Sequence, residues 1–166
     1  NTLGLRLTGA VPVGSDMKLL YTAEYADQSD YADGASTIDA DYSLFELGAS
    51  AKGATMKFSR EVLGGDGAYA FATPLATLHA FQGWADKFLV TPVNGIEDLS
   101  ATLSGEVFGI KLAAVYHIFT SDSANVDYGT ELDVLATKKL TDNTLVGVKY
   151  ASYDADSDPK NTGGTA

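Results

Sequence analysis

Carboxylates are the residues of this chain whose number and spacing first suggest chemistry. The sequence has 22 Asp and Glu against 11 Lys and Arg, a net charge of −11. Near its end, Asp154, Asp156 and Asp158 have the D-x-D-x-D spacing that opens a calcium-binding loop. Pro159 stands where that loop needs glycine and Thr165 where it needs an acid, so the pattern argues against an EF-hand. A loose surface Ca²⁺ site remains as the hypothesis.

Other catalytic or metal-binding patterns are weak in this sequence. There are no cysteines, so neither a disulfide nor a thiolate metal site can form. His79 and His117 lie far apart and lack the spacing of metal ligands, and no G-x-S-x-G motif occurs. We therefore expect no enzyme, no cofactor and no resident metal. The acidic balance argues against nucleic acid as a partner.

Short segments that alternate apolar and polar residues must position these charged groups, because they make up most of the chain. In the clearest segment Leu99, Leu103 and Val107 share one face, while Ser100 and Thr102 share the other. No window approaches the ~18 apolar residues of a transmembrane helix, whereas transmembrane strands leave a weaker trace. The expected strands cover residues 2–10, 17–27, 38–52, 54–63, 97–107, 110–120, 128–140 and 144–153.

The segment 38–52 changes phase along its length. Ile38, Ala40, Tyr42 and Leu44 share one parity, and the apolar positions then move to the other parity at Phe45. One extra residue in a strand reverses every later side chain, so this pattern predicts a β-bulge.

Connections between the segments alternate in length and character. Short turns at 11–16, 52–53, 108–109 and 141–143 alternate with longer, acidic connections at 28–37, 64–96, 121–127 and after 153. Short periplasmic turns and longer extracellular loops are typical of outer-membrane barrels. Tyrosines expected on the apolar face near the long loops would form an aromatic girdle; they are Tyr25, Tyr42, Tyr116, Tyr128 and Tyr150.

These patterns predict an all-β fold, an antiparallel transmembrane β-barrel of which eight consecutive strands are visible. Since the loop lengths place both ends on the outer side, we expect these strands to belong to a larger barrel. The alternative is a soluble or surface-exposed acidic all-β domain with a structural or interaction role that binds cations. The two interpretations differ over Leu3, Leu5, Leu103 and Leu112, which face lipid in a barrel and are buried in a soluble domain.

The longest connection, 64–96, differs from the rest of the chain. It holds the only tryptophan, and its apolar residues have helix-like spacing at Leu75, Leu78, Phe81, Ala85 and Phe88. It is expected to be a partly helical loop that folds into the pore, the alternative being a self-packed cap outside the barrel. The aromatic residues expected against the wall are Phe81, Trp84 and Phe88. The polar residues expected to meet solute are His79, Gln82, Asp86 and Lys87.

In a barrel the polar parity faces the pore. The predicted pore-lining residues are Arg6, Lys18, Glu24, Lys57, Glu106, Lys111, His117, Glu131, Asp133 and Lys149. Lys139, Asp39, Asp41 and Asp98 are expected on the same side. Most bases lie near short turns and most acids near long loops, so the pore would be cationic at one end and anionic at the other, an arrangement that selects ions. Alternatively, these charges only pair across neighbouring strands.

Four stretches carry a family resemblance: FATPLATLHAFQGWADKFLVTPVNGIEDL, GIKLAAVYHIFTSD, DYGTELDVLATKKL and VGVKYASYDAD. From about residue 42 onward the chain resembles the C-terminal part of porin-like proteins of the alginate-export family in Gram-negative bacteria. The resemblance implies a monomeric barrel of about eighteen strands. It further implies contact with outer-membrane lipid and lipopolysaccharide and passage of a small hydrophilic solute. The exporter for which the family is named is expected to line its pore with arginines, but Arg6 and Arg60 are the only arginines here, so alginate is not implied.

Overall fold

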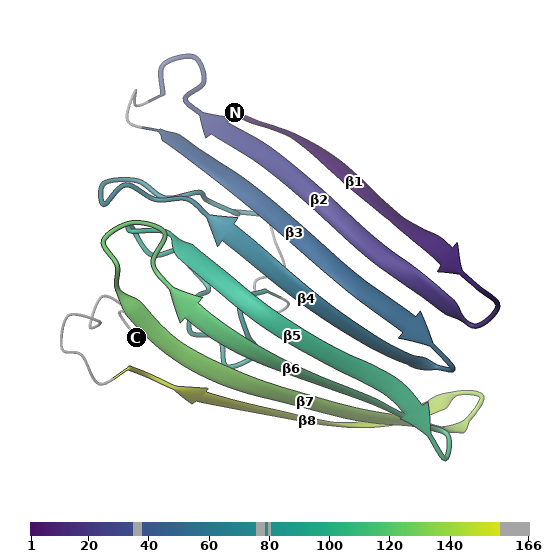
Figure 1. The fold of residues 1–166 in the computed structure, drawn as a ribbon. Coiled ribbons are helices and arrows are strands. Elements are labelled where there is room, and N and C mark those ends of the chain that lie inside the picture. The colour runs from purple at the N-terminus through teal and green to yellow at the C-terminus, as the bar shows by residue number, and fades with distance from the viewer. Residues whose placement is uncertain (35–37, 76–78, 80, 157–166) are drawn as a thin grey trace.

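One antiparallel sheet makes up the fold, with each strand paired to its neighbours in sequence (Figure 1). The computed structural model describes residues 1–34, 38–75, 79 and 81–156. The strands are β1 (Thr2–Val13), β2 (Met17–Ser29), β3 (Asp39–Ala51), β4 (Ala54–Leu63), β5 (Ile96–Val107), β6 (Ile110–Thr120), β7 (Asp127–Thr141) and β8 (Thr144–Asp154). The all-β antiparallel prediction is confirmed. Within the described residues the sheet is open, with β1 and β8 at its edges, and it does not close into a barrel.

Tight turns at one end of the sheet follow from left-handed backbone conformations. Lys52 and Gly53 have φ angles of 50° and 82°, and Phe108 and Gly109 have 52° and 71°. Positive φ at both central residues is the geometry of the type I′ turn, whose twist matches that of the flanking strands. These turns fix the register of β3 with β4 and of β5 with β6, and they leave the longer connections at the opposite end (Figure 1).

The bulge predicted in the third strand is wrong. β3 pairs with β2 and with β4 in continuous register along its length. Its first half is apolar on the other parity because Ala40 is buried and Tyr42 half-buried beneath the 64–95 connection, with the Tyr42 ring 5.5 Å from that of Phe71. Without a bulge, Asp39 and Asp41 lie on the opposite face from the one expected.

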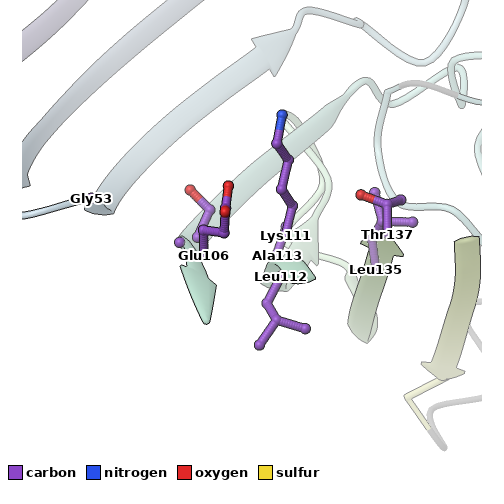
Figure 2. A pocket seen from close by; sticks show the side chains of 9 residues that line it. Gly53, Glu106, Lys111, Leu112, Ala113, Leu135 and Thr137 are labelled. Carbon is purple, nitrogen blue, oxygen red and sulfur yellow. The ribbon is translucent and has the colours of Figure 1, made fainter. Parts of the chain in front are cut away.

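The two faces of the sheet differ sharply. We call the face against which residues 64–95 pack the loop face, and the opposite one the apolar face. Figure 2 shows Lys111 and Leu112, neighbours in β6, pointing to opposite sides of the sheet. Leu5 is 80% exposed and Leu47 69%. The exposed large side chains of the apolar face include Leu3, Leu5, Leu7, Leu19, Phe45, Leu47, Met56, Phe58, Leu103, Leu112, Val134 and Val148.

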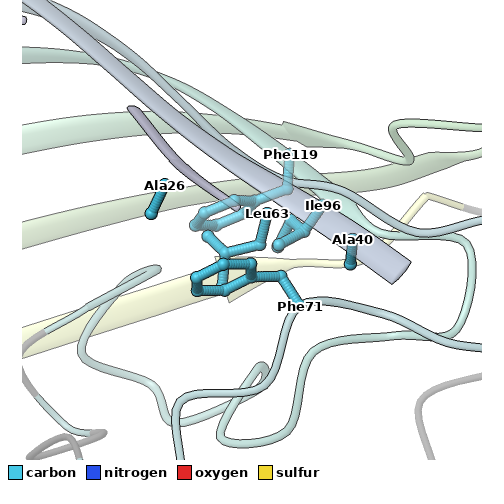
Figure 3. Packing of buried hydrophobic residues seen from close by; sticks show 6 residues of the cluster. All are labelled: Ala26, Ala40, Leu63, Phe71, Ile96 and Phe119. Atoms are coloured by element: carbon cyan, nitrogen blue, oxygen red, sulfur yellow. The ribbon is translucent and has the colours of Figure 1, made fainter. Parts of the chain in front are cut away.

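The hydrophobic core lies on the loop face, at the end of the long connections. It consists of Ala26, Ala40, Leu63, Phe71, Ile96 and Phe119 (Figure 3). Phe119 is fully buried, and its ring centroid is 4.8 Å from that of Phe88. The core therefore joins the sheet to residues 64–95, and it leaves the apolar face uncovered.

Two finer predictions about this end of the sheet need correction. In the described part of the 64–95 connection the backbone forms turns and bends without an α-helix; residues 76–78 and 80, where part of the helical spacing falls, lie outside the described residues. Tyr25, Tyr116 and Tyr150 are exposed on the apolar face, as predicted. Tyr42 and Tyr128 instead pack against the core on the loop face, so their assignment to a girdle is wrong. No helix in the described residues is long and apolar enough to cross a membrane.

Candidate functional site

The connection between β4 and β5, residues 64–95, lies across the loop face and is here called the docked loop. Its first limb is held by Gln28 of β2. Gln28 Oε1 accepts hydrogen bonds from the Ala72 N–H at 2.8 Å and the Tyr69 hydroxyl at 2.7 Å, and Gln28 Nε2 donates to the Ala72 carbonyl at 3.0 Å. The buried amide of Gln28 thus ties the loop to β2, which is separated by β3 from the strand where the loop begins.

Hydrogen bonds between its two limbs give the docked loop a defined shape. Thr91 Oγ1 donates to the Phe71 carbonyl at 2.7 Å, and the Gly67 N–H donates to the Val93 carbonyl at 2.8 Å. At the first turn, Asp66 Oδ1 accepts from the N–H groups of Tyr69 and Ala68, each at 2.8 Å, and these bonds lower the pKa of the Asp66 carboxyl.

The tip of the docked loop presents backbone N–H groups to two carboxylates of β7. The Trp84 N–H donates to Asp133 Oδ2 at 3.0 Å, and the Ala85 N–H donates to Glu131 Oε1 at 2.7 Å. Gln82 immediately before them has a φ of 50°. Successive N–H groups in a turn of this kind form a concave anion-binding nest. The loop tip therefore forms a binding site for two carboxylates of the loop face.

Gly83 is required in this turn for two reasons. Its φ of 83° lies in the left-handed region that side-chain-bearing residues avoid. A Cβ at this position would lie 2.5 Å from Glu131 Oε2, closer than any real contact. Glycine thus allows the backbone to approach the carboxylate closely enough for the Ala85 hydrogen bond.

A third carboxylate of the loop face, that of Glu61 in β4, binds the side chain of Gln82 in the loop tip. Gln82 Nε2 donates to Glu61 Oε2 at 2.8 Å, and the Tyr42 hydroxyl donates to Glu61 Oε1 at 2.7 Å. Both carboxylate oxygens are thereby satisfied. Gln82 was predicted to meet solute, but its side chain is buried against β4.

Beneath the loop tip lies a buried network of acids around one imidazole. His117 Nδ1 lies 2.9 Å from both carboxylate oxygens of Asp98, and His117 Nε2 lies 3.7 Å from Asp133 Oδ2. Glu131 is 1% exposed and Asp133 0%. Among the described residues neither pairs with a lysine or arginine, and Glu131 Oε2 and Asp133 Oδ1 have no hydrogen-bond partner. Unpaired buried carboxylate oxygens are rare because removing them from water is costly.

On its solvent side the tip carries an exposed polar chain. Lys149 Nζ of β8 lies 4.0 Å from the centre of the Trp84 ring, a cation–π contact, and 2.8 Å from His79 Nε2. His79 Nδ1 lies 2.6 Å from Asp86 Oδ1. Lys87 Nζ lies 5.6 Å from the Tyr153 ring centre. These groups, together with the 46%-exposed Phe81, line the open side of the docked loop.

The residues predicted to line a pore share the loop face. The register places all ten on it: Arg6, Lys18, Glu24, Lys57, Glu106, Lys111, His117, Glu131, Asp133 and Lys149. Two bases pair with acids on neighbouring strands, Arg6 with Glu24 at 2.7 Å and Lys57 with Glu46 at 3.1 Å, as the pairing alternative expects. Of the aromatic residues predicted to pack on the wall, Trp84 and Phe88 make ring or cation contacts with it, whereas Phe81 is exposed.

Two important residues, Glu61 and Gln28, were not singled out in the sequence. Glu61 shares the parity of Lys57 and Ser59, so its place on the loop face could have been read from the alternation of β4. Its hydrogen bonds to Tyr42 and Gln82 had no local signal, since they depend on how a distant loop folds back.

Two hollows on the surface of the protein are shallow. One, of about 400 Å³, opens near the short turns beside Glu106 and Lys111 (Figure 2). Another, of about 380 Å³, is lined by Asp127, Asp154 and Asp156; Asp158, the third member of the predicted calcium motif, lies outside the described residues. Within the described chain no group of three or more acidic or histidine side chains is arranged to hold a metal ion.

Comparison with known proteins gives no relative for this arrangement. No family model, no curated protein and no solved structure matches the chain.

Proposed function

We propose that this chain forms part of the wall of a bacterial outer-membrane β-barrel that passes small hydrophilic solutes, with the docked loop narrowing its pore. The loop face would line the pore and the apolar face would meet lipid. The solutes would include charged ones.

The observation that carries this proposal is the inverted distribution of polar and apolar groups over the sheet. Asp133 and Glu131 are almost completely buried, while Leu5 and Leu47 are mostly exposed. A sheet of a soluble protein buries its apolar face and exposes its polar one. Alternation with the apolar side outward and the polar side inward is typical of transmembrane barrels. An apolar face of this extent on a soluble protein would need a partner to cover it.

The docked loop supports the second half of the proposal. It is fixed to β2 through Gln28 and to β7 through Glu131 and Asp133, so it crosses the loop face from one side of the sheet towards the other. A loop so fastened inside a barrel would reduce the open cross-section. The solutes that pass it would meet Lys149, His79 and Asp86.

The proposal assigns the environment as well as the activity. The apolar face would contact outer-membrane lipid and lipopolysaccharide, and additional strands would pair with β1 and β8 to complete a monomeric barrel, since an unpaired backbone edge is costly in lipid. The resemblance to porin-like proteins of the alginate-export family agrees with this assignment and stays a prediction. No catalytic role is proposed.

Flotation with lipid tests the proposal against the soluble-domain alternative. The protein, refolded in the presence of phospholipid vesicles, is expected to rise with them in a density gradient and to resist extraction by high salt and alkali. Without lipid or detergent it is expected to aggregate through its apolar face. A protein that stays folded and monomeric in detergent-free buffer and does not float would overturn the proposal.

A further inference from the structure

We propose that the tip of the docked loop is held closed by a single proton shared between the carboxyl groups of Glu131 and Asp133, and that loss of this proton releases the tip. The inference rests on the proposed function only where it treats the loop as narrowing a pore. The shared proton and the contacts that it maintains, here called the latch, are a property of the folded chain.

The hydrogen bonds around the pair leave one proton to be supplied. Glu131 Oε1 accepts from Ala85 and Asp133 Oδ2 accepts from Trp84, so each carboxyl has one satisfied oxygen. The other two oxygens, Glu131 Oε2 and Asp133 Oδ1, are buried without a donor in the described residues. Glu131 and Asp133 are two residues apart on the same face of β7, and they bind the N–H groups of two adjacent loop residues, so their carboxyl groups lie side by side. One proton between these oxygens gives an O–H···O⁻ bond that satisfies both.

Two unprotonated carboxylates cannot share this site without strain. Like charges in close contact and out of water disfavour double ionisation, and one member of such a pair keeps its proton. The pair titrates as a unit, so the proton belongs to both residues. When the proton is lost to bulk water, Glu131 and Asp133 become two adjacent buried anions whose repulsion outweighs the stronger N–H bonds from the loop tip. Separation of the tip then admits the water that hydrates Glu131 Oε2 and Asp133 Oδ1.

The charged and titratable neighbours limit what else could control the latch. Facing the pair are His117 from β6, Asp98 from β5, Glu61 from β4 and Tyr153 from β8, with Lys149 and Lys87 beside the tip. His117 lies beside the pair, but its Nδ1 is committed to Asp98 at 2.9 Å and its Nε2 is 3.7 Å from Asp133 Oδ2, beyond a direct hydrogen bond. His117 can moderate the repulsion and does not replace the shared proton.

The backbone conformation of the tip also favours its release. Gln82 and Asp86, on either side of the two N–H donors, have positive φ angles of 50° and 59°, a backbone conformation unfavourable for residues with side chains that the surrounding contacts must maintain. The hydrogen bonds of Gln28 and Thr91 that hold the base of the loop involve neither Glu131 nor Asp133. Release would therefore free the tip while the base stays in place.

Fluorescence of Trp84, the only tryptophan, tests the proposal directly. Its N–H binds Asp133 and its ring lies against Lys149, so release of the tip exposes the ring to water. In detergent micelles the wild-type emission is expected to shift to longer wavelength as pH rises from about 5 to about 9, the range in which buried carboxyl groups lose protons.

Glu131→Gln is the decisive variant. Its amide oxygen can accept from Ala85 while its NH₂ donates to Asp133, which reproduces the protonated pair permanently. This variant is expected to keep the short-wavelength emission over the whole pH range. The matched control Glu106→Gln, on the same face but near the short turns, is expected to respond like the wild type. Infrared spectra of the wild type should show a protonated carboxyl band that disappears over the same pH range.

Three results would overturn the latch: a wild-type emission that does not change with pH, a pH response in Glu131→Gln equal to that of the wild type, or no protonated carboxyl band at any pH. The second result would assign the switch to His117. Because these readouts need no conduction, failure of flotation with lipid would contradict the pore and leave the test of the latch intact.

Discussion

The backbone N–H of Ala85 lies 2.7 Å from Glu131 Oε1, although the two residues are 46 positions apart in the sequence. This bond joins the tip of the docked loop, which connects β4 and β5, to β7, the neighbour of the edge strand β8. Together with the bond from the Trp84 N–H to Asp133, it fixes the loop tip to two acidic residues of β7. The loop position is thus specified by backbone donors and side-chain acceptors together.

Gly83→Ala is expected to detach the loop tip. The added Cβ would meet Glu131 Oε2 at 2.5 Å, and alanine also disfavours the φ of 83°. Trp84 emission should move to longer wavelength at every pH. Gly105→Ala is the matched control, because its Cβ would meet nothing closer than 3.4 Å. A Gly83→Ala protein with wild-type emission would show that the tip does not depend on this close approach.

Deletion of residues 75–89 is expected to increase single-channel conductance. This segment contains the Trp84 and Ala85 contacts with β7, whereas the anchors at Gln28 and Thr91 lie outside it. The measurement is made in planar lipid bilayers on the channel that contains this chain. Unchanged conductance would mean that the docked loop does not constrict the pore.

Neutralisation of Lys18, Lys57 and Lys111 to glutamine is expected to increase the preference of the channel for cations, because these bases lie on the loop face. The reversal potential in a salt gradient measures this change. Lys138→Gln serves as control, since Lys138 lies on the apolar face. If reversal potentials stay the same, the bases serve only in cross-strand pairs such as Lys57 with Glu46.

Leu47→Arg is expected to destabilise the membrane-inserted protein by about 2–4 kcal/mol, the cost of arginine on the lipid face near the bilayer midplane. Leu47 lies in the middle of β3 and is 69% exposed. Thr102→Arg, on the loop face, should cost much less. Folding free energies in vesicles, from urea titrations, provide the comparison. A change within about 0.5 kcal/mol, as for an ordinary surface site in water, would contradict lipid contact.

The alternation of apolar and polar residues was sufficient to predict the strands and, for most residues, the face of the sheet on which the side chain lies. The period of two is a local property of an extended backbone. β4 and β6 have the bounds that their residue patterns indicate. β1 continues through Pro12 to Val13, beyond the end that its residue pattern indicates.

The docked loop explains where the sequence interpretation failed. The apolar residues Ala40 and Tyr42 suggested a bulge, but they serve as the surface on which the loop packs. Gln82 looked like a solute contact, yet it satisfies the carboxylate of Glu61. Each of these roles depends on contacts between distant segments, which periodicity within one segment does not encode.

The central claim, that the apolar face meets lipid and the loop face meets water, is tested most directly at two adjacent residues of β5. The protein has no cysteine, so Leu103→Cys and Thr102→Cys each provide a single labelling site, on opposite faces of one strand. In lipid vesicles an environment-sensitive fluorophore at position 103 should emit as in hydrocarbon and be quenched by a lipid-borne quencher. The fluorophore at position 102 should respond to a water-soluble quencher. Equal access of the water-soluble quencher to both positions would contradict the account.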